Sequence, residues 1–278
     1  DLGCSDLAVE AARAALAEAG FAASDLELII VSTVTPDYPT PSTACLVQDR
    51  LGAPGAAAFD LSAGCSGFVY AMAAAQGLIS SGIFQNALVI GAEILSRVTN
   101  WEDRSTCVLF GDGAGAVVLQ KGDSGRGIID FVLKSDGGGA ELLYIPAGGS
   151  RLPASEESIA GHLHSVRMNG NEIFKFAVRV VENILEELMA RQGIEAETLD
   201  YLFLHQANRR IIEHIRKRLH LPPEKVPVNL DRYGNTSSAT IPIALHEEAA
   251  AGRLKKNDLV ALVAFGAGLT WGGMLLRW

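Results

Sequence analysis

Two glycine-rich stretches of similar sequence, FGDGAGAVVL at residues 110–119 and FGAGLTWGGMLL at residues 265–276, each close one half of the chain. Upstream of each stretch, continuous apolar runs alternate with segments of helical periodicity. Such alternation is typical of an α/β protein whose sheet is covered by helices on both faces. Because the elements follow the same order twice, an internal duplication is the simplest explanation. We therefore predict an α/β protein of two similar halves, residues 1–121 and 122–278.

The periodicity also predicts the individual elements of each half. In the first half we expect helices at 6–19, 43–51 and 66–80, and strands at 26–32, 56–61, 87–92 and 115–120. In the second half we expect helices at 171–191, 209–219 and 238–251, and strands at 127–134, 201–205, 226–229, 259–265 and 274–277. The strand at 127–134 has no counterpart before the first helix. We therefore expect that a leading segment with one central strand is missing from this chain.

Composition limits the class of protein. The chain has 278 residues, of which 49% are hydrophobic and 20% are charged, as in a soluble globular protein. No apolar run reaches the ~20 residues that a membrane helix needs, and the N-terminal residues do not resemble a signal peptide. The cysteines at positions 4, 45, 65 and 107 form no CxxC pair and no cluster with histidine. We therefore expect a cytoplasmic protein without disulfides, metal or membrane contact.

Charge is unevenly distributed along the chain. The formal net charge of −9 argues against a nucleic-acid-binding protein. Within residues 208–220, however, five basic residues face a single acid, Glu213. This basic stretch suggests an anionic partner, although a solvated helix face would explain it equally well.

Cys65 is the first candidate for chemistry. It lies in SAGCSGF at residues 62–68, between a predicted strand and an apolar helix. Free amides and the positive end of a helix dipole lower the pKa of a thiol, and small neighbours let a substrate approach. We predict that Cys65 is a nucleophile that rests as a thiolate. For Cys4, Cys45 and Cys107 we prefer a structural role.

His205 and Asn235 are the second and third candidates. YLFLHQAN at residues 201–208 places His205 at the carboxyl end of a strand, where open α/β sheets place their sites. A structural histidine would fit this position equally well. Asn235 follows Gly234 in DRYGNTSSATIPIAL, and the sequence leaves open whether it caps a helix or takes part in chemistry. Equivalent elements of the two halves carry Cys65 and Asn235, so a pseudo-twofold axis would bring them together.

Five motifs together resemble one known family. These are DLSAGCSGF, FGDGAGAVVL, LFLHQANRRII, DRYGNTSSATIPIAL and AFGAGLTWGGMLL. They resemble the motifs of β-ketoacyl-acyl-carrier-protein synthase III, and the likeness runs from the first helix to Trp278. The resemblance implies a thiolase-like fold, a duplicated αβαβα arrangement of layers. The family also has a leading strand and hairpin that supply part of its coenzyme A site and that this chain lacks.

The resemblance implies a reaction as well. An acyl-CoA would transfer its acyl group to Cys65, and malonyl-acyl-carrier protein would then lose carbon dioxide. The resulting enolate would attack the acyl-cysteine and give 3-ketoacyl-acyl-carrier protein, which initiates type II fatty-acid synthesis. His205 and Asn235 would donate hydrogen bonds to the malonyl thioester oxygen. The coenzyme A thioester is a substrate, and the resemblance implies no cofactor.

Further positions take roles only through the resemblance. The backbone amides of Cys65 and Ala267 would form a second oxyanion site, and Phe265 would shield the departing carboxylate. Coenzyme A would contact Arg104, Gly170, Asn171 and Asn208. The carrier protein would face Lys175, Arg210, Lys217 and Arg218.

Neighbouring families can be compared residue by residue. A degradative thiolase would need a second reactive cysteine near the C-terminus, but no cysteine follows Cys107. Elongating condensing enzymes have a histidine at the position where this chain has Asn235. A synthase III-like enzyme of secondary metabolism with another acyl donor remains an alternative, as does a non-catalytic homologue. Thr40 occupies a position where some relatives carry a bulky aromatic residue, often contributed across a dimer interface. We therefore expect a homodimer. Because threonine is smaller than an aromatic residue, we also expect the acyl pocket to have room for a branched or longer primer.

Overall fold

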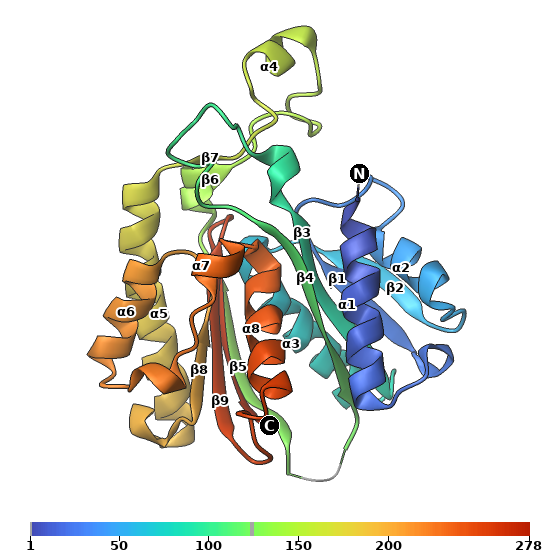
Figure 1. Cartoon of the computed structure of the whole chain (residues 1–278), viewed down its shortest axis with the longest axis vertical. Coiled ribbons are helices and arrows are strands. Elements are labelled where there is room, and N and C mark those ends of the chain that lie inside the picture. Colours follow the sequence, from blue (N-terminus) through green and yellow to red (C-terminus); the bar gives the residue numbers. More distant parts are fainter. Residues whose placement is uncertain (1, 123–124) are drawn as a thin grey trace.

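Two four-stranded sheets stand side by side in the computed structural model, which describes residues 2–122 and 125–278 (Figure 1). Helices α1 and α2 pack on the outer face of the first sheet, and α5 packs on the outer face of the second with α6 beside it. Helices α3 and α8 contact both sheets and fill the layer between them. This order of layers confirms the predicted αβαβα fold. Residues 1, 123 and 124 lie outside the described residues. Residue 1 is the predicted start of the first half, and residues 123 and 124 lie next to the predicted boundary between the halves.

The elements of the first sheet precede those of the second in the chain. The first group comprises α1 (Cys4–Ala19), β1 (Leu28–Ser32), α2 (Thr43–Leu51), β2 (Ala57–Leu61), α3 (Gly67–Ser80), β3 (Asn86–Ile94) and β4 (Asp112–Gln120). The second group comprises β5 (Gly127–Ser135), β6 (Leu143–Tyr144), α4 (Glu156–Ala160), β7 (Arg167–Met168), α5 (Gly170–Gln192), β8 (Tyr201–Leu204), α6 (Arg209–Arg218), α7 (Leu230–Tyr233), α8 (Thr240–Ala250), β9 (Leu259–Gly266) and β10 (Thr270–Arg277). Short 3-10 helices occur as well, and two of them, η2 (Gly64–Ser66) and η7 (Ser237–Ala239), belong to the site described below.

The strand orders of the two sheets are related. The first sheet runs β2-β1-β3-β4 and the second β5-β10-β9-β8. Each has parallel neighbours, β1 with β3 and β8 with β9, and then an antiparallel strand, β4 or β10. Strand β5 lies at the edge of its sheet, beside β10. The strand that opens the second half therefore lies at an edge of its sheet and not at its centre, and the leading strand expected for the first half stays a prediction.

One predicted strand, residues 226–229, does not form. The segment is irregular and leads directly into α7. Pro227 has no backbone N–H, so it cannot donate to a ladder beside β8. The side chain of Gln206 joins the segment instead, since its Nε2 donates to Pro227 O (3.3 Å) and its Oε1 accepts from Asn229 N (3.1 Å). Strand β8 therefore forms one edge of its sheet.

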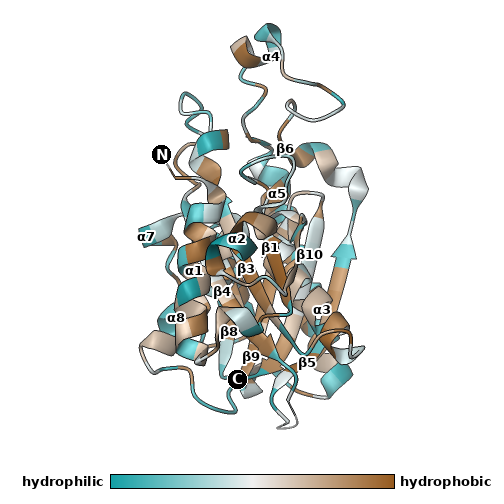
Figure 2. Cartoon of the chain, turned by 90° about the vertical axis from the view of Figure 1, so that its right-hand side faces the viewer, coloured by the Kyte–Doolittle hydropathy of each residue, from teal (hydrophilic) through white to brown (hydrophobic). Residues whose placement is uncertain are grey.

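Apolar packing follows the five layers. One buried cluster lies between α1, α2 and the first sheet, a second surrounds α3 between the sheets, and a third lies under α5 and α6. Apolar colour is concentrated on the strands in Figure 2. Helix α3 is apolar on most of its circumference, as expected for a helix covered on both sides. Within the two described ranges, no helix combines the length and the apolar character needed to cross a membrane.

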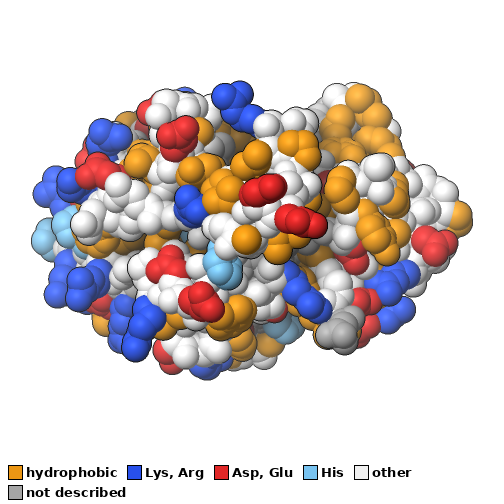
Figure 3. Space-filling view, turned by 90° about the horizontal axis from the view of Figure 1, so that it is seen from above, with side chains coloured by type: hydrophobic (Ala, Val, Ile, Leu, Met, Phe, Trp, Pro, Cys, Tyr) orange, Lys and Arg blue, Asp and Glu red, His pale blue; other side chains and the backbone are white. Residues whose placement is uncertain are grey.

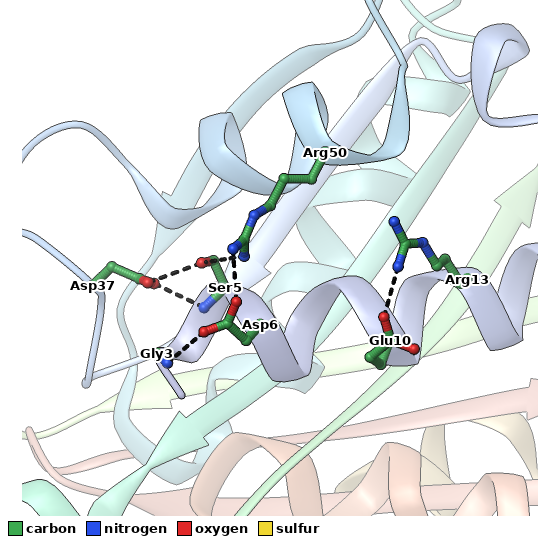
Figure 4. Close-up of polar contacts among 7 residues, drawn as sticks. All are labelled: Gly3, Ser5, Asp6, Glu10, Arg13, Asp37 and Arg50. Carbon is green, nitrogen blue, oxygen red and sulfur yellow. Dashed lines mark hydrogen bonds and ion pairs between the residues drawn. The ribbon is translucent and has the colours of Figure 1, made fainter. Parts of the chain in front are cut away.

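Polar contacts join the start of α1 to the loop between β1 and α2 (Figure 4). The carboxylate of Asp37 accepts hydrogen bonds from Ser5 N (2.8 Å) and Ser5 Oγ (2.9 Å). Arg50 of α2 donates to Ser5 Oγ (2.9 Å) and to Asp6 Oδ1 (2.7 Å). These bonds fix the loop that carries Thr40, whose side chain is exposed in the single chain.

Candidate active site

A cavity of about 620 Å³ opens at the carboxyl ends of β8 and β9. Its wall contains Cys65, His205 and Asn235, the three residues singled out from the sequence. Cys65 comes from the first half of the chain and the other two come from the second. The predicted meeting of the halves at one site is therefore present in the structure.

Two glycines set the position of Cys65. The residue lies in η2, directly before α3, and its side chain is half-buried. A Cβ atom on Gly266 would lie 2.3 Å from Cys65 N, and a Cβ atom on Gly64 would lie 2.7 Å from Ala267 N. Gly64 also has a φ of 54°, which favours glycine. The absent side chains let the backbone of Gly266 approach Cys65 and that of Gly64 approach Ala267, as a shared oxyanion site would require.

The protonation state of Cys65 differs from the prediction. Burial raises the pKa of its thiol to about 12, the charge of Glu93 acts in the same direction, and the Ser237 hydroxyl opposes both. Desolvation of the sulfur thus outweighs the effect expected from the end of α3. This raised pKa does not favour the predicted resting thiolate, which stays a prediction. The thiol must lose its proton during the reaction.

His205 is held as a neutral imidazole. Its backbone N–H donates to Val263 O (2.9 Å), and its ring packs edge-on against Phe265 at 5.3 Å. Burial lowers its pKa to about 3. Its Nδ1 lies 2.8 Å from Thr240 Oγ1, which also donates to Ser237 O (3.0 Å). The Thr240 hydroxyl can donate to Ser237 O or to Nδ1, so the neutral imidazole can carry its single proton on Nδ1 or on Nε2.

Asn235 caps a turn and also lines the cavity, and its part in the chemistry stays a prediction. Its Oδ1 accepts from Ser237 N (2.8 Å), as in a turn-capping residue, which leaves Nδ2 as a donor at the cavity wall. Its backbone is bonded to the first half, with Asn235 N donating to Leu109 O (2.8 Å) and Gly111 N donating to Asn235 O (3.0 Å). These bonds place the carboxamide across the interface between halves.

The remaining predicted residues divide into two groups. Those on the cavity wall are Gly170, Asn171, Lys175, Asn208, Arg210 and Phe265. Those not on its wall are Thr40, Arg104, Lys217, Arg218 and Ala267. Arg104 is exposed, but its neighbour Ser105 lines the cavity. The structural role preferred for Cys45 does not fit its exposure, whereas Cys4 is buried as expected.

Several wall residues were not identified from the sequence. They are mostly apolar and include Phe110, Leu143, Met168, Ile173, Phe174 and Phe176. The buried side of α5 accounts for Ile173 and Phe176, so helical periodicity could have indicated them. Leu143 and Met168 belong to the β6–β7 pair within the long insertion, where no periodicity marks either residue.

Helix α6 carries the basic stretch beside the cavity. Asn208 Oδ1 caps it by accepting from Arg210 N (2.8 Å). Ile211, Ile212 and Ile215 are buried, while Lys217 is exposed, so the helix has one apolar face and one charged face. Lysine and arginine side chains gather on the α5 and α6 side of the molecule, at the left of Figure 3.

Comparison with known proteins gives the family. Residues 59–137 match the model for 3-oxoacyl-[acyl-carrier-protein] synthase III, and residues 189–278 match the model for its C-terminal part. A relative from Caldanaerobacter subterraneus subsp. tengcongensis, a β-ketoacyl-[acyl-carrier-protein] synthase III, is 54% identical over 274 residues, which are 99% of this chain and 83% of the relative. The chain belongs to the 3-oxoacyl-[acyl-carrier-protein] synthase III family. The resemblance seen in its motifs is thereby confirmed.

Solved structures of synthase III proteins agree with this assignment. The 3-oxoacyl-[acyl-carrier-protein] synthase III from Aquifex aeolicus VF5 is 46% identical, with a TM-score of 0.92 over 100% of this chain and 85% of that one. The priming β-ketosynthase of the R1128 polyketide pathway is 32% identical, with a TM-score of 0.90 over 99% of this chain and 81% of that one. The fold is the thiolase-like fold that the motifs predict.

Proposed function

We propose that this chain condenses an acyl-CoA primer with malonyl-acyl-carrier protein to give 3-ketoacyl-acyl-carrier protein, the initiating condensation of type II fatty-acid synthesis. The observation that carries the proposal is a single cavity in which a thiol, a neutral imidazole and a carboxamide converge from two halves of the chain. Identity to the curated synthase III relative is 54%, against 32% to the polyketide priming enzyme, which favours fatty-acid synthesis over secondary metabolism.

The first half-reaction is acyl transfer to Cys65. Because the resting thiol is protonated, its proton passes to Nε2 of His205 as the sulfur attacks the thioester. The negative charge that forms on the thioester oxygen is stabilised by the adjoining amides of Cys65 and Ala267. The proton then passes from Nε2 to the departing coenzyme A sulfur. The imidazole is neutral again at the end of this step.

The second half-reaction is decarboxylation of the malonyl group followed by carbon–carbon bond formation. Nδ2 of Asn235 donates to the malonyl thioester oxygen, where negative charge develops as the enolate forms. His205 adds a second donor from Nε2 when the Thr240 hydroxyl donates to Nδ1, since that hydroxyl can donate or accept. The nearby ring of Phe265 keeps the environment apolar, which favours loss of the carboxylate charge as carbon dioxide.

Binding of the two substrates uses the rest of the wall and its surroundings. Gly170, Asn171 and Asn208 line the path of the pantetheine arm, and Arg104 binds the nucleotide end. The carrier protein docks on a surface formed by Lys175, Arg210, Lys217 and Arg218. We place the enzyme in the cytoplasm as a homodimer, with Thr40 contributed to the primer pocket of the partner subunit.

The donors can be separated from the nucleophile by mutation. His205→Ala and Asn235→Ala each remove one hydrogen bond to the enolate, and such donors are worth about 10²–10³ in rate. In both variants we expect the rate of carbon dioxide release from radiolabelled malonyl-acyl-carrier protein to fall by about that factor. Asn235→Ala should still be acylated at Cys65 by acetyl-CoA. Release of carbon dioxide at the wild-type rate from both variants would contradict these roles.

A further inference from the structure

Two hydroxyl groups join the segment of the nucleophile to the hairpin turn that follows β9. Thr270 Oγ1, at the start of β10, lies 2.8 Å from Ala63 O and 2.9 Å from Ala267 O. Ser66 Oγ, in η2, lies 2.8 Å from both Ala63 O and Thr270 Oγ1. Ala63 and Ser66 belong to the first half of the chain, whereas Ala267 and Thr270 belong to the second. The network therefore crosses the interface between the halves, one residue away from Cys65.

The two hydroxyl protons can serve both carbonyl oxygens. A backbone oxygen only accepts, and each hydroxyl has one proton to donate. Ser66 is buried, and its hydroxyl reaches the oxygen of Ala63. When Ser66 donates there, the proton of Thr270 is free for Ala267 O. Thr270 thus holds the carbonyl of the residue whose amide is the second oxyanion donor in the proposed reaction.

The amides of Cys65 and Ala267 are the two oxyanion donors of that reaction. In the two described ranges, no backbone carbonyl accepts a hydrogen bond from either N–H. Neither amide is therefore fixed by a backbone hydrogen bond of its own, and its direction depends on the peptide groups beside it. Ala267 N also lies close to the first half, since a Cβ atom on Gly64 would be 2.7 Å from it.

The turn that carries Ala267 spans residues 267–269, between β9 and β10. At its end, Leu269 exchanges two backbone hydrogen bonds with Asp136, both of 2.8 Å, so this part is anchored within the second half. At its start, the Thr270 hydroxyl contacts Ala267 O and reaches across to Ala63 O. Without that hydroxyl, the peptide group of Ala267 would lose this link to the segment of the nucleophile.

We infer that Thr270 is a positioning residue for acyl transfer. Its hydroxyl holds the peptide group of Ala267 against the segment that carries Cys65, so that both amides point at the thioester oxygen as negative charge develops there. Thr270 itself is not on the cavity wall, and it acts through Ala267. The inference rests on the proposed function, because it needs acyl transfer to Cys65 with those two amides as donors.

This role separates two chemical steps. Acyl transfer places negative charge on the oxygen that faces the two amides. Loss of carbon dioxide places it on the malonyl thioester oxygen, which the proposed reaction assigns to His205 and Asn235. The side chains of these two residues bond to Thr240 and to Ser237 N, outside the network of Thr270. Removal of the Thr270 hydroxyl should therefore slow acyl transfer and spare the loss of carbon dioxide.

Thr270→Val replaces the hydroxyl with a methyl group of similar size. We expect acyl transfer from acetyl-CoA to Cys65, measured by rapid quench, to slow by about 10²-fold, the cost of misplacing a reacting group by about 1 Å. The KM for acetyl-CoA should change by less than about twofold, because the lost interaction is made in the transition state. Thr270→Ser keeps the hydroxyl and should retain most of the wild-type rate.

Release of carbon dioxide from radiolabelled malonyl-acyl-carrier protein is the second measurement. It is made in a Cys65→Ala background, so that neither acylation nor condensation contributes. Addition of Thr270→Val to that background should leave the rate unchanged. A merely structural role would lower this rate together with the rate of acyl transfer.

The carbonyl group of the acetyl-enzyme gives a spectroscopic signature. Hydrogen bonds from the two amides lower the stretching frequency of the thioester carbonyl, and infrared difference spectra with isotope-labelled acetyl-CoA isolate that band. In Thr270→Val the band should move toward the frequency of a free thioester. In Thr270→Ser it should stay at the wild-type position.

Thr198→Val is the matched control. Thr198 Oγ1 also contacts a carbonyl three residues earlier, Glu195 O at 2.6 Å, but Thr198 is exposed and lies outside the cavity wall. This variant should leave acyl transfer and the carbonyl band unchanged. If Thr270→Val does not fold, Thr270→Ala removes the hydroxyl without setting a methyl group against the two carbonyls, and it is compared with Thr270→Ser in the same way.

The outcomes separate this role from the proposed function. Wild-type acyl transfer with an unshifted carbonyl band in Thr270→Val would overturn the role of Thr270 while the proposed function stands. Equal losses of acyl transfer and of carbon dioxide release would also overturn it, because they would indicate general damage to the site. Failure of the wild type to accept an acetyl group on Cys65 would instead contradict the proposed function.

Discussion

At the scale of single residues, the active site depends on contacts that only glycine permits. Gly266 ends β9 against the nucleophile, and its missing side chain leaves the amide of Cys65 uncovered. A methyl group 2.3 Å from that nitrogen would have to push one backbone away, because real Cβ contacts are longer. The β9–β10 hairpin and helix α3 hold both segments, so the displacement would fall on the sulfur and the oxyanion site.

Gly266→Ala should therefore impair catalysis. Misplacement of reacting groups by about 1 Å costs about 10² in rate, and we expect a loss of that size in acyl transfer from acetyl-CoA. Gly77→Ala is the matched control. A Cβ at Gly77, inside α3, meets no atom within 4 Å. This control should keep wild-type activity and gain about 0.5–1 kcal/mol in free energy of unfolding. Equal activity in both variants would contradict the importance of the contact.

At the scale of elements, the sequence predicts most helices and strands because apolar periodicity reports burial directly. It fails at residues 226–229, where an apolar run containing Pro227 could not join a ladder. It also gives no signal for β6, α4 and β7, whose positions depend on packing against distant segments. That insertion supplies Leu143 and Met168 of the cavity wall, so part of the site could not be found from sequence alone.

The proposed role of helix α6 in docking the carrier protein can be tested separately from the chemistry at Cys65. Lys217→Glu and Arg218→Glu reverse exposed charges that lie outside the cavity wall. We expect the KM for malonyl-acyl-carrier protein to rise by about tenfold at low salt, with the effect shrinking as salt screens the surface. Acyl transfer from acetyl-CoA should not change. Lys256→Glu, an exposed charge between α8 and β9, is the control and should leave both measurements unaltered. An unchanged KM in the α6 variants would contradict this docking surface.

At the scale of the whole molecule, the site exists because two similar halves meet. The duplication let the sequence predict that Cys65 and Asn235 would approach each other. The protonation states could not be predicted in the same way. The pKa values of Cys65 and His205 are set by desolvation, which depends on every layer packed around them. The sequence also did not single out the acid Glu93. It lies within an otherwise apolar strand, and its burial depends on the layers packed around that strand. The limits of the two halves at residues 121 and 122 stay a prediction.

The central claim is that Cys65 accepts the acyl group. The most direct measurement incubates the protein with acetyl-CoA, digests it and locates the acetyl group by mass spectrometry. We predict one acetyl thioester per chain on the peptide that contains Cys65, and none on any cysteine of a Cys65→Ala variant. An unmodified Cys65 in the wild type, or a thioester on the exposed Cys45 instead, would contradict the account.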